Sequence, residues 1–181
     1  DRTAIIYDSA IIGAKEYISY AELQDRVARC ADVLLQNGIG YGDRVIIYMP
    51  MIPQALVAML ACARVGAVHS VVFGGFAAAE LAKRIDDATP KMIITASCGL
   101  EPGRVVAYKP LIDDAIELSA HKIDNVLLYQ REMCKAAMID SRDMDWDEAL
   151  AAAGQADCVP VKSEDPAYIL YTSGTTGTPK G

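Results

Sequence analysis

The sequence predicts an α/β fold built from βαβ units around a mostly parallel sheet. Two observations lead to this prediction. Runs rich in β-branched residues, such as DRVIIYM at 43–49, are apolar on both alternating faces, as expected of strands covered on both sides. These runs alternate with helix-like segments along most of the chain, which indicates βαβ units in a doubly wound sheet.

The chain opens with a predicted hairpin and a well-marked helix. Residues 3–8 and 15–20 show strand-like patterns on either side of a turn. Ser19 and Glu22 have the spacing of a capping box, in which each side chain satisfies a backbone N–H of the first turn. Apolar residues then recur at helical spacing until Gly38, a typical helix end.

The remaining strands and helices are predicted from runs of strand-forming apolar residues and from apolar residues at helical spacing. Strands are expected at 43–49, 67–73, 91–95, 125–129 and 167–173. Helices are expected at 54–66, 77–88, 111–119 and 145–154. Residues 131–144 are the least periodic segment, and we expect them to run over the surface.

Composition excludes several classes of protein. The 181 residues fit one domain or a large piece of a bigger one, and a 52% hydrophobic share favours a buried core. A net charge of -7 argues against a nucleic-acid binder. No apolar run is long enough to span a membrane, and Pro50 and Pro53 interrupt the longest. Without an initiator Met or a signal peptide, the chain is expected to be a fragment of a cytoplasmic protein, with the mitochondrial matrix as the alternative.

Cysteine and histidine usage gives no sign of a metal site. The cysteines are odd in number and widely spaced, which suits free and mostly buried thiols in a reducing compartment: Cys30, Cys62, Cys98, Cys134 and Cys158. Both histidines, His69 and His121, are far from each other in sequence. His69 lies among strand-like residues, and we expect it to be a core histidine with its hydrogen bonds satisfied.

The C-terminal stretch YTSGTTGTPKG has a composition suited to binding a polyphosphate. Gly174 and Gly177 allow backbone N–H groups to converge on an anion, the hydroxyl side chains add donors, and Lys180 adds a positive charge. The spacing does not match the P-loop of common nucleotide hydrolases. Composition alone leaves a flexible surface loop as an equal alternative.

The specific residues of the motif favour the phosphate-binding loop over the flexible surface loop. YTSGTTGTPKG resembles the phosphate-binding signature of the adenylate-forming superfamily, which includes acyl-CoA synthetases. Residues 45–76 resemble the acetyl- and propionyl-CoA synthetase branch. Residues 96–122, with DWDEAL and DCVPV beyond them, look most like propionate–CoA ligases and the related short-chain family member 3. The resemblance covers essentially the whole chain but only about a quarter to a third of a full member, so residues 1–181 would be part of the large N-terminal AMP-binding domain.

The resemblance implies a two-step reaction with ATP, Mg²⁺ and coenzyme A. A carboxylate and ATP give an acyl-adenylate and diphosphate, and the thiol of coenzyme A then displaces AMP. In the family, the motif binds the β- and γ-phosphates of ATP. The resemblance implies the same role for the matching residues Thr172, Ser173, Gly174, Thr175, Thr176, Gly177, Thr178, Pro179 and Lys180. Lys180 would be a charge clamp and not a nucleophile. The resemblance also implies that EPGR contacts coenzyme A: Glu101, Pro102, Gly103 and Arg104.

Arg104 is the expected principal contact, because a guanidinium binds phosphate with two hydrogen bonds. Acetate-type members often carry another arginine in place of Glu101, which favours propionate–CoA ligase over acetate–CoA ligase. A noncatalytic nucleotide-binding module is the alternative of another class. The expected partners are small molecules, namely a short-chain carboxylate, ATP and coenzyme A, without nucleic acid or membrane; the oligomeric state stays open. The fragment alone is expected to be inactive.

Overall fold

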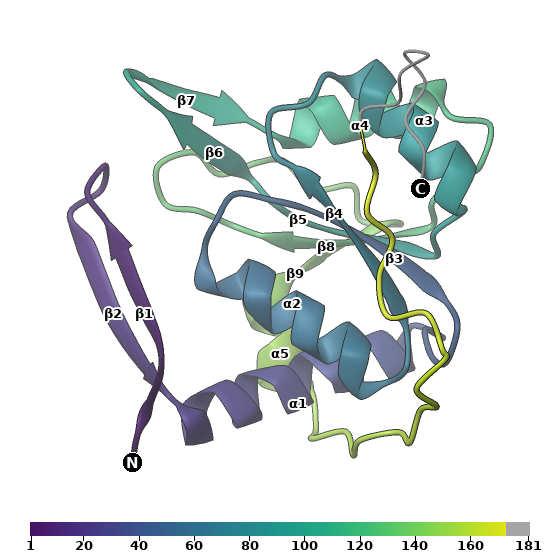
Figure 1. The fold of residues 1–181 in the computed structure, drawn as a ribbon. Helices are drawn as coiled ribbons and strands as arrows, with labels where there is room; N and C mark the ends of the chain where they lie inside the picture. The colour runs from purple at the N-terminus through teal and green to yellow at the C-terminus, as the bar shows by residue number, and fades with distance from the viewer. Residues whose placement is uncertain (173–181) are drawn as a thin grey trace.

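The computed structural model describes residues 1–172 and has the expected α/β architecture. β1 (Thr3–Ser9) and β2 (Ala14–Ser19) form an antiparallel hairpin beside the main body (Figure 1). The main sheet has five strands in the order β4-β3-β5-β8-β9, and all its neighbours are parallel. Its strands are β3 (Arg44–Met49), β4 (Val68–Phe73), β5 (Met92–Ala96), β8 (Asn125–Tyr129) and β9 (Asp143–Asp145).

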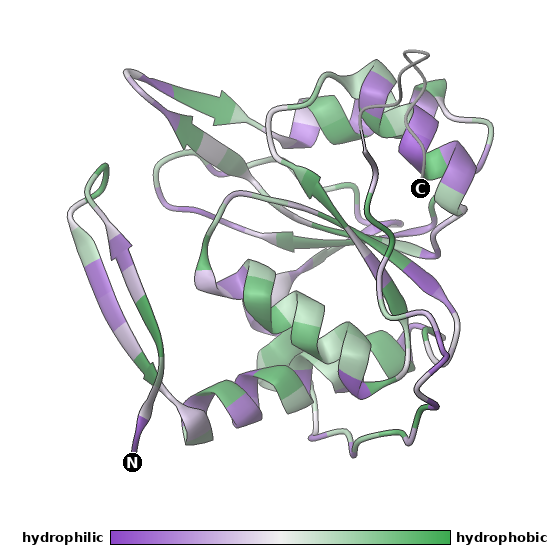
Figure 2. Cartoon of the chain, viewed as in Figure 1, coloured by the Kyte–Doolittle hydropathy of each residue, from purple (hydrophilic) through white to green (hydrophobic). Residues whose placement is uncertain are grey.

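Helices cover both faces of this sheet (Figure 1). One face carries α1 (Tyr20–Gln36), α2 (Pro53–Arg64) and α5 (Trp146–Ala152), and the other carries α3 (Ala78–Ala88) and α4 (Lys109–Leu118). Successive residues of β3 therefore enter two different cores: Ile47 packs on the α1–α2 side and Ile46 on the α3–α4 side. Both are fully buried, and burying a side chain of this size stabilises the fold by about 1.5–3 kcal/mol. Figure 2 shows the resulting apolar strands at the centre of the molecule.

The capping box that the sequence predicts is present at the start of α1. The Glu22 N–H donates to Ser19 Oγ at 3.2 Å, and the Ser19 N–H donates to the Glu22 carboxylate at 2.8 Å. Hydrogen bonds from the Ser19 backbone N–H and then from its side chain lower the pKa of the Glu22 carboxyl. At the other end, Gly38 has a φ of 71°, so the helix ends where the sequence placed its stop.

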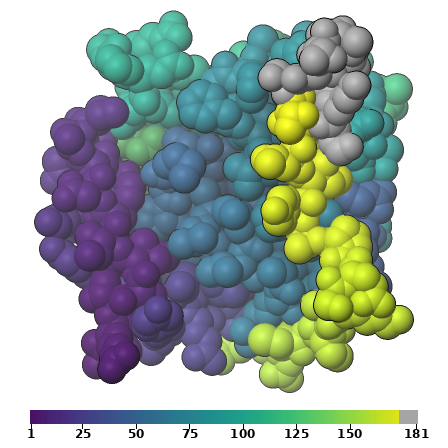
Figure 3. All heavy atoms as spheres, in the orientation of Figure 1, coloured from purple at the N-terminus to yellow at the C-terminus, as the bar shows by residue number. Residues whose placement is uncertain are grey.

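The C-terminal prediction of a strand at 167–173 is wrong for the residues that can be compared. The segment runs along the β4 edge, where Tyr168 forms an isolated parallel bridge with His69 (Figures 1 and 3). The His69 N–H donates to the Ala167 carbonyl at 3.3 Å, and the Ile169 N–H donates to the His69 carbonyl at 2.9 Å. His69 is the only residue of β4 that bridges this segment up to residue 172, so the two do not form a continuous ladder there.

The expectation that residues 131–144 run over the surface holds for most of the segment, but Arg131 and Asp143 are buried. Asp143 begins β9, and its side chain is fully buried between two cations. It accepts from Lys109 Nζ at 2.9 Å and from Arg142 Nε at 2.7 Å, while Asp113 pairs with the same two cations. Burial alone would raise the pKa of Asp143, but the hydrogen bonds from Arg142, the Ile139 N–H and Lys109 lower it. This network fastens α4 to the edge of the sheet.

None of the helices within residues 1–172 is both long and apolar enough to cross a bilayer. The cysteine prediction is confirmed over the same residues: all five thiols are free, three are buried, and only Cys158 is exposed. Burial raises the pKa of Cys62 to about 12.

Candidate functional site

The carboxyl ends of β3 and β5 define the point at which a ligand site is expected. These two strands are neighbours, but the chain leaves β3 for α2 on one face and leaves β5 for α4 on the other. Loops that depart in opposite directions from adjacent parallel strands leave a crevice between them. The candidate site is therefore at this edge of the sheet.

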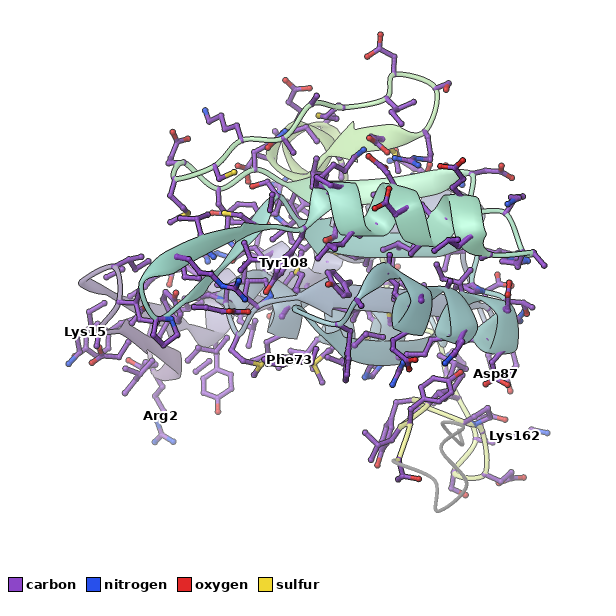
Figure 4. All side chains as sticks on the ribbon, turned by 90° about the horizontal axis from the view of Figure 1, so that it is seen from above. Arg2, Lys15, Phe73, Asp87, Tyr108 and Lys162 are labelled. Carbon is purple, nitrogen blue, oxygen red and sulfur yellow. The ribbon has the colours of Figure 1, made fainter. Side chains whose placement is uncertain are left out.

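A cavity of about 250 Å³ lies at this edge, between the β1–β2 hairpin and the strand ends. Most of its lining is apolar, with Glu101 and Arg131 as the charged members. The lining residues are Tyr7, Ser9, Ile11, Pro50, Met51, Ile52, Phe73, Gly74, Leu100, Glu101, Tyr108 and Arg131. Figure 4 shows Tyr108 and Phe73 on the side where the hairpin of β6 (Cys98–Glu101) and β7 (Arg104–Ala107) leaves the body. A cavity with few polar groups suits a ligand that is held by shape and oriented by one or two charges.

Tyr108 forms the inner wall of this cavity. Its ring fits against Gly74 and Gly99, where a Cβ atom would approach it closer than 3.0 Å at either position. Its hydroxyl donates to the Gly74 carbonyl at 2.7 Å, and its ring packs edge-on against Tyr48 at a centroid distance of 5.1 Å. Burial, then the nearby Tyr48, raises the pKa of Tyr108 to about 12, so the hydroxyl remains a donor at neutral pH.

The segment FGGF after β4 is held by a second tyrosine. The Tyr48 hydroxyl donates to the Phe76 carbonyl at 2.9 Å and accepts from the Gly75 N–H at 3.1 Å. Burial raises the pKa of this hydroxyl as well. Together with Tyr108, it fixes the glycine loop where β4 reaches the cavity.

The EPGR residues form the tip of a hairpin that the sequence did not predict. β6 (Cys98–Glu101) pairs with β7 (Arg104–Ala107), and Gly103 has a φ of 78° after Pro102, as a type II turn requires. Cys98 is buried in β6, and burial raises the pKa of its thiol. Glu101 contributes to the cavity lining from the end of this strand.

Arg104 is exposed at this tip and pairs with Glu101. Its Nε donates to Glu101 Oε2 at 2.8 Å, and its Nη2 lies 2.5 Å from the same oxygen. Of the four residues predicted to contact coenzyme A, Glu101 lines the cavity, and Arg104 is paired with it at the hairpin tip. Their role in binding stays a prediction.

The predicted phosphate-binding residues Thr172–Lys180 can be placed only at their first member. Thr172 is exposed at the end of the segment beside β4, and Ser173–Lys180 lie outside the described residues. Tyr171 leads into the motif and is anchored to α3, since its hydroxyl donates to Asp87 at 2.5 Å. Burial and this hydrogen bond raise the pKa of Tyr171. The structure therefore fixes where the motif begins, next to the C-terminal part of α3.

His69 differs from the prediction in one respect. It is a buried residue of β4, as expected, but its Nδ1 has no hydrogen-bond partner within residues 1–172. Burial lowers the pKa of His69 and favours the neutral ring. The expectation of a satisfied histidine is wrong for the part of the chain that can be examined.

Arg131 is the site residue that the sequence analysis missed. It follows β8 at the carboxyl edge of the sheet and is only 7% exposed. Its Nη1 donates to the Cys98 carbonyl at 3.1 Å, and its backbone N–H donates to Ser97 Oγ at 2.8 Å. Its position directly after a buried strand was the available signal, because ligand-binding residues collect there in parallel sheets.

The parallel α/β sheet is covered by helices on both faces, and comparison with known proteins identifies the family to which this fold belongs. Residues 1–181 match the model of the AMP-binding enzyme family, and the chain belongs to that family. The predicted resemblance to adenylate-forming enzymes is thereby confirmed.

Three relatives show which members the chain is similar to. It is 56% identical over 182 residues to the mitochondrial acyl-CoA synthetase short-chain family member 3 of Rattus norvegicus, covering 100% of this chain and 27% of the relative. It is 48% identical over 183 residues to the acetyl-coenzyme A synthetase of Pasteurella multocida, a match that covers 100% of this chain and 28% of the relative. A solved structure, the acetoacetyl-CoA synthetase from Streptomyces lividans, superposes with a TM-score of 0.88 at 28% identity. The match covers 99% of this chain and 27% of that structure's chain. The chain therefore spans about a quarter of the length of the relatives it matches.

Proposed function

We propose that this chain is part of an AMP-forming ligase that joins a short-chain carboxylate to coenzyme A, with propionate as the substrate and acetate as the alternative. The observation that carries the proposal is the family match along all 181 residues, which includes both the phosphate motif and the EPGR hairpin. Residues 1–181 would form part of the N-terminal AMP-binding domain, with the C-terminal domain beyond them. The protein would act in the cytoplasm or in the mitochondrial matrix.

The first step needs the negative charge of ATP to be neutralised. A carboxylate is an anion and is repelled by the triphosphate that it must attack, so positive charge and N–H donors around the outer phosphates lower the barrier. In this proposal, Thr172–Lys180 provide those donors, and Lys180 clamps the β- and γ-phosphates. Mg²⁺ would be carried by the phosphate oxygens, which are its usual ligands in such sites.

The second step needs coenzyme A to be held with its thiol directed at the adenylate. The tip of the β6–β7 hairpin offers Arg104 at the rim of the cavity, where a phosphate group can reach it. Glu101 already occupies part of that guanidinium, which leaves the outward-facing nitrogens for the ligand. Arg104 therefore binds the exposed, nucleotide end of coenzyme A in this scheme.

The test uses the full-length protein and the exchange of labelled diphosphate into ATP. Exchange that depends on added carboxylate is the result we expect, and competition between propionate and acetate identifies the preferred acid. Lys180→Gln should reduce exchange by about 100-fold or more, the scale of losing one transition-state charge contact. Lys162→Gln removes an exposed lysine ahead of the motif and serves as the matched control. ATP binding without any exchange would instead indicate the noncatalytic nucleotide-binding module.

A further inference from the structure

The guanidinium of Arg131 is a buried cation whose charge is not balanced by the residues around it. Its side chain has one hydrogen bond to protein in the described part of the chain, the 3.1 Å bond from Nη1 to the Cys98 carbonyl. A guanidinium has five N–H donors, so several remain available. Burying a charge without a counter-ion is unfavourable, and proteins normally pair such groups.

The carboxylates around Arg131 are engaged elsewhere. Three of them line the two cavities that Arg131 also lines, one of about 250 Å³ and one of about 210 Å³. Each forms an ion pair with another cation: Glu101 with Arg104, Glu16 with Arg26, and Glu132 with Lys135. Within residues 1–172, Arg131 has no carboxylate partner at all. The missing negative charge must come from outside this part of the molecule.

The cavity itself indicates the kind of anion. Apart from its two charged residues, its walls are mainly apolar, with Phe73, Met51 and Ile52 among them. Such a lining accepts a largely uncharged chain that carries one anionic group. Because Arg131 is buried and Arg104 is exposed at the hairpin tip, a ligand that meets both needs two separate anionic groups, and phosphates are suited to the paired donors of a guanidinium.

We propose that Arg131 binds the diphosphate of coenzyme A inside this cavity, while Arg104 meets the 3′-phosphate at the rim. This inference rests on the proposed function. Coenzyme A has the required chemistry, because its diphosphate joins a phosphorylated nucleoside to the long, mostly neutral pantetheine chain. Arg131 would then set the depth to which that chain enters, and its buried charge would be compensated only when coenzyme A is bound.

The experiment measures thioester formation by the full-length protein at varied concentrations of coenzyme A. Arg131→Gln should raise the KM for coenzyme A by about 10- to 100-fold, the scale of losing hydrogen bonds to a charged group. Arg131→Lys keeps the charge, and its KM for coenzyme A should lie between those of Arg131→Gln and the wild type. Diphosphate exchange measured without coenzyme A provides the reference for folding and for the adenylation step.

Dephospho-coenzyme A, which lacks the 3′-phosphate, separates the two arginines. The penalty of Arg131→Gln should be the same with this analogue as with coenzyme A, whereas the penalty of Arg104→Gln should nearly vanish. Arg44→Gln is the matched control, since Arg44 also donates to backbone carbonyls but lies at the opposite edge of the sheet, where its Nε bonds the Ala88 carbonyl at 2.9 Å. It should leave the KM for coenzyme A unchanged.

Two results would overturn the role of Arg131. One is a KM for coenzyme A that is unchanged in Arg131→Gln. The other is an equal fall in exchange and thioester formation together with a lowered melting temperature, which would mean that Arg131 only supports the Cys98 carbonyl. Calorimetric titration with coenzyme A compares the same variants without turnover. An inactive wild type would thus refute the proposed function, while the titration would still decide the question of Arg131.

Discussion

Replacing Gly99 with alanine tests the packing of Tyr108, on which the shape of the cavity depends. An alanine Cβ at this position would lie closer than 3.0 Å to three atoms of the Tyr108 side chain, including the hydroxyl. The tyrosine must therefore move, and it would lose its 2.7 Å hydrogen bond to the Gly74 carbonyl. Overpacking costs about 1–3 kcal/mol and the hydrogen bond about 0.5–1.5 kcal/mol, so we expect a loss of about 2–4 kcal/mol.

A loss of this size is easily measured by urea or thermal unfolding. For a chain of this length it corresponds to a fall in melting temperature of roughly 10 °C. Gly40→Ala is the matched control, because a Cβ at Gly40 meets no atom within 4 Å. In a Tyr108→Ala background, Gly99→Ala should cost much less, and the double-mutant cycle isolates this coupling. Equal unfolding midpoints for Gly99→Ala and the wild type would refute the packing described here.

Three further predictions concern other parts of the fold. Asp143→Asn should lower the free energy of unfolding by about 1.5–3 kcal/mol, because Lys109 and Arg142 would each lose one carboxylate partner while keeping Asp113. Since the pKa of Asp143 is lowered on folding, the wild type should lose this contribution as the pH falls below about 4, and the variant should show a flatter acid profile in unfolding titrations. Ala77→Ser should stabilise the protein by up to about 1 kcal/mol in thermal unfolding, because the N-cap of α3 has no side-chain hydrogen bond. Alkylation at pH 8 followed by mass spectrometry should modify Cys158 rapidly and Cys62 only after unfolding, and rapid labelling of Cys62 would contradict its burial.

The elements that the sequence predicted well are those specified by local chemistry. The capping box and Gly38 mark both ends of α1 without any knowledge of the tertiary fold, and both ends are confirmed. β3 could be predicted because its residues are apolar on both faces, and the structure buries Ile46 and Ile47 in different cores. The hydrophobic pattern alone therefore indicated a sheet covered on both sides.

The elements that were missed depend on distant partners. The hairpin at Cys98–Ala107 is short, and its place in the fold is fixed by Tyr108 packing against Gly74, which is 34 residues earlier in the chain. Asp143 looked like a surface residue because its compensating cation, Lys109, is also far away in sequence. The strand expected at 167–173 has strong β-forming residues, but up to residue 172 it pairs with β4 at only one position. No single-sequence pattern carries information of this kind.

The two arginines of the candidate site show where motif reading and structural reading separate. Arg104 was predicted as a site residue because it belongs to the EPGR motif, but in the structure it is exposed and paired with Glu101. Arg131 belongs to no motif, and its significance comes from burial combined with the pairing of every carboxylate around its two cavities. An exposed arginine that already has an ion-pair partner loses little free energy when its ligand dissociates. A buried arginine without a partner becomes an uncompensated charge when its ligand dissociates, which is unfavourable. We therefore expect Arg131 to contribute more of the affinity for coenzyme A than Arg104, and to do so with less dependence on salt, because a buried charge is poorly screened.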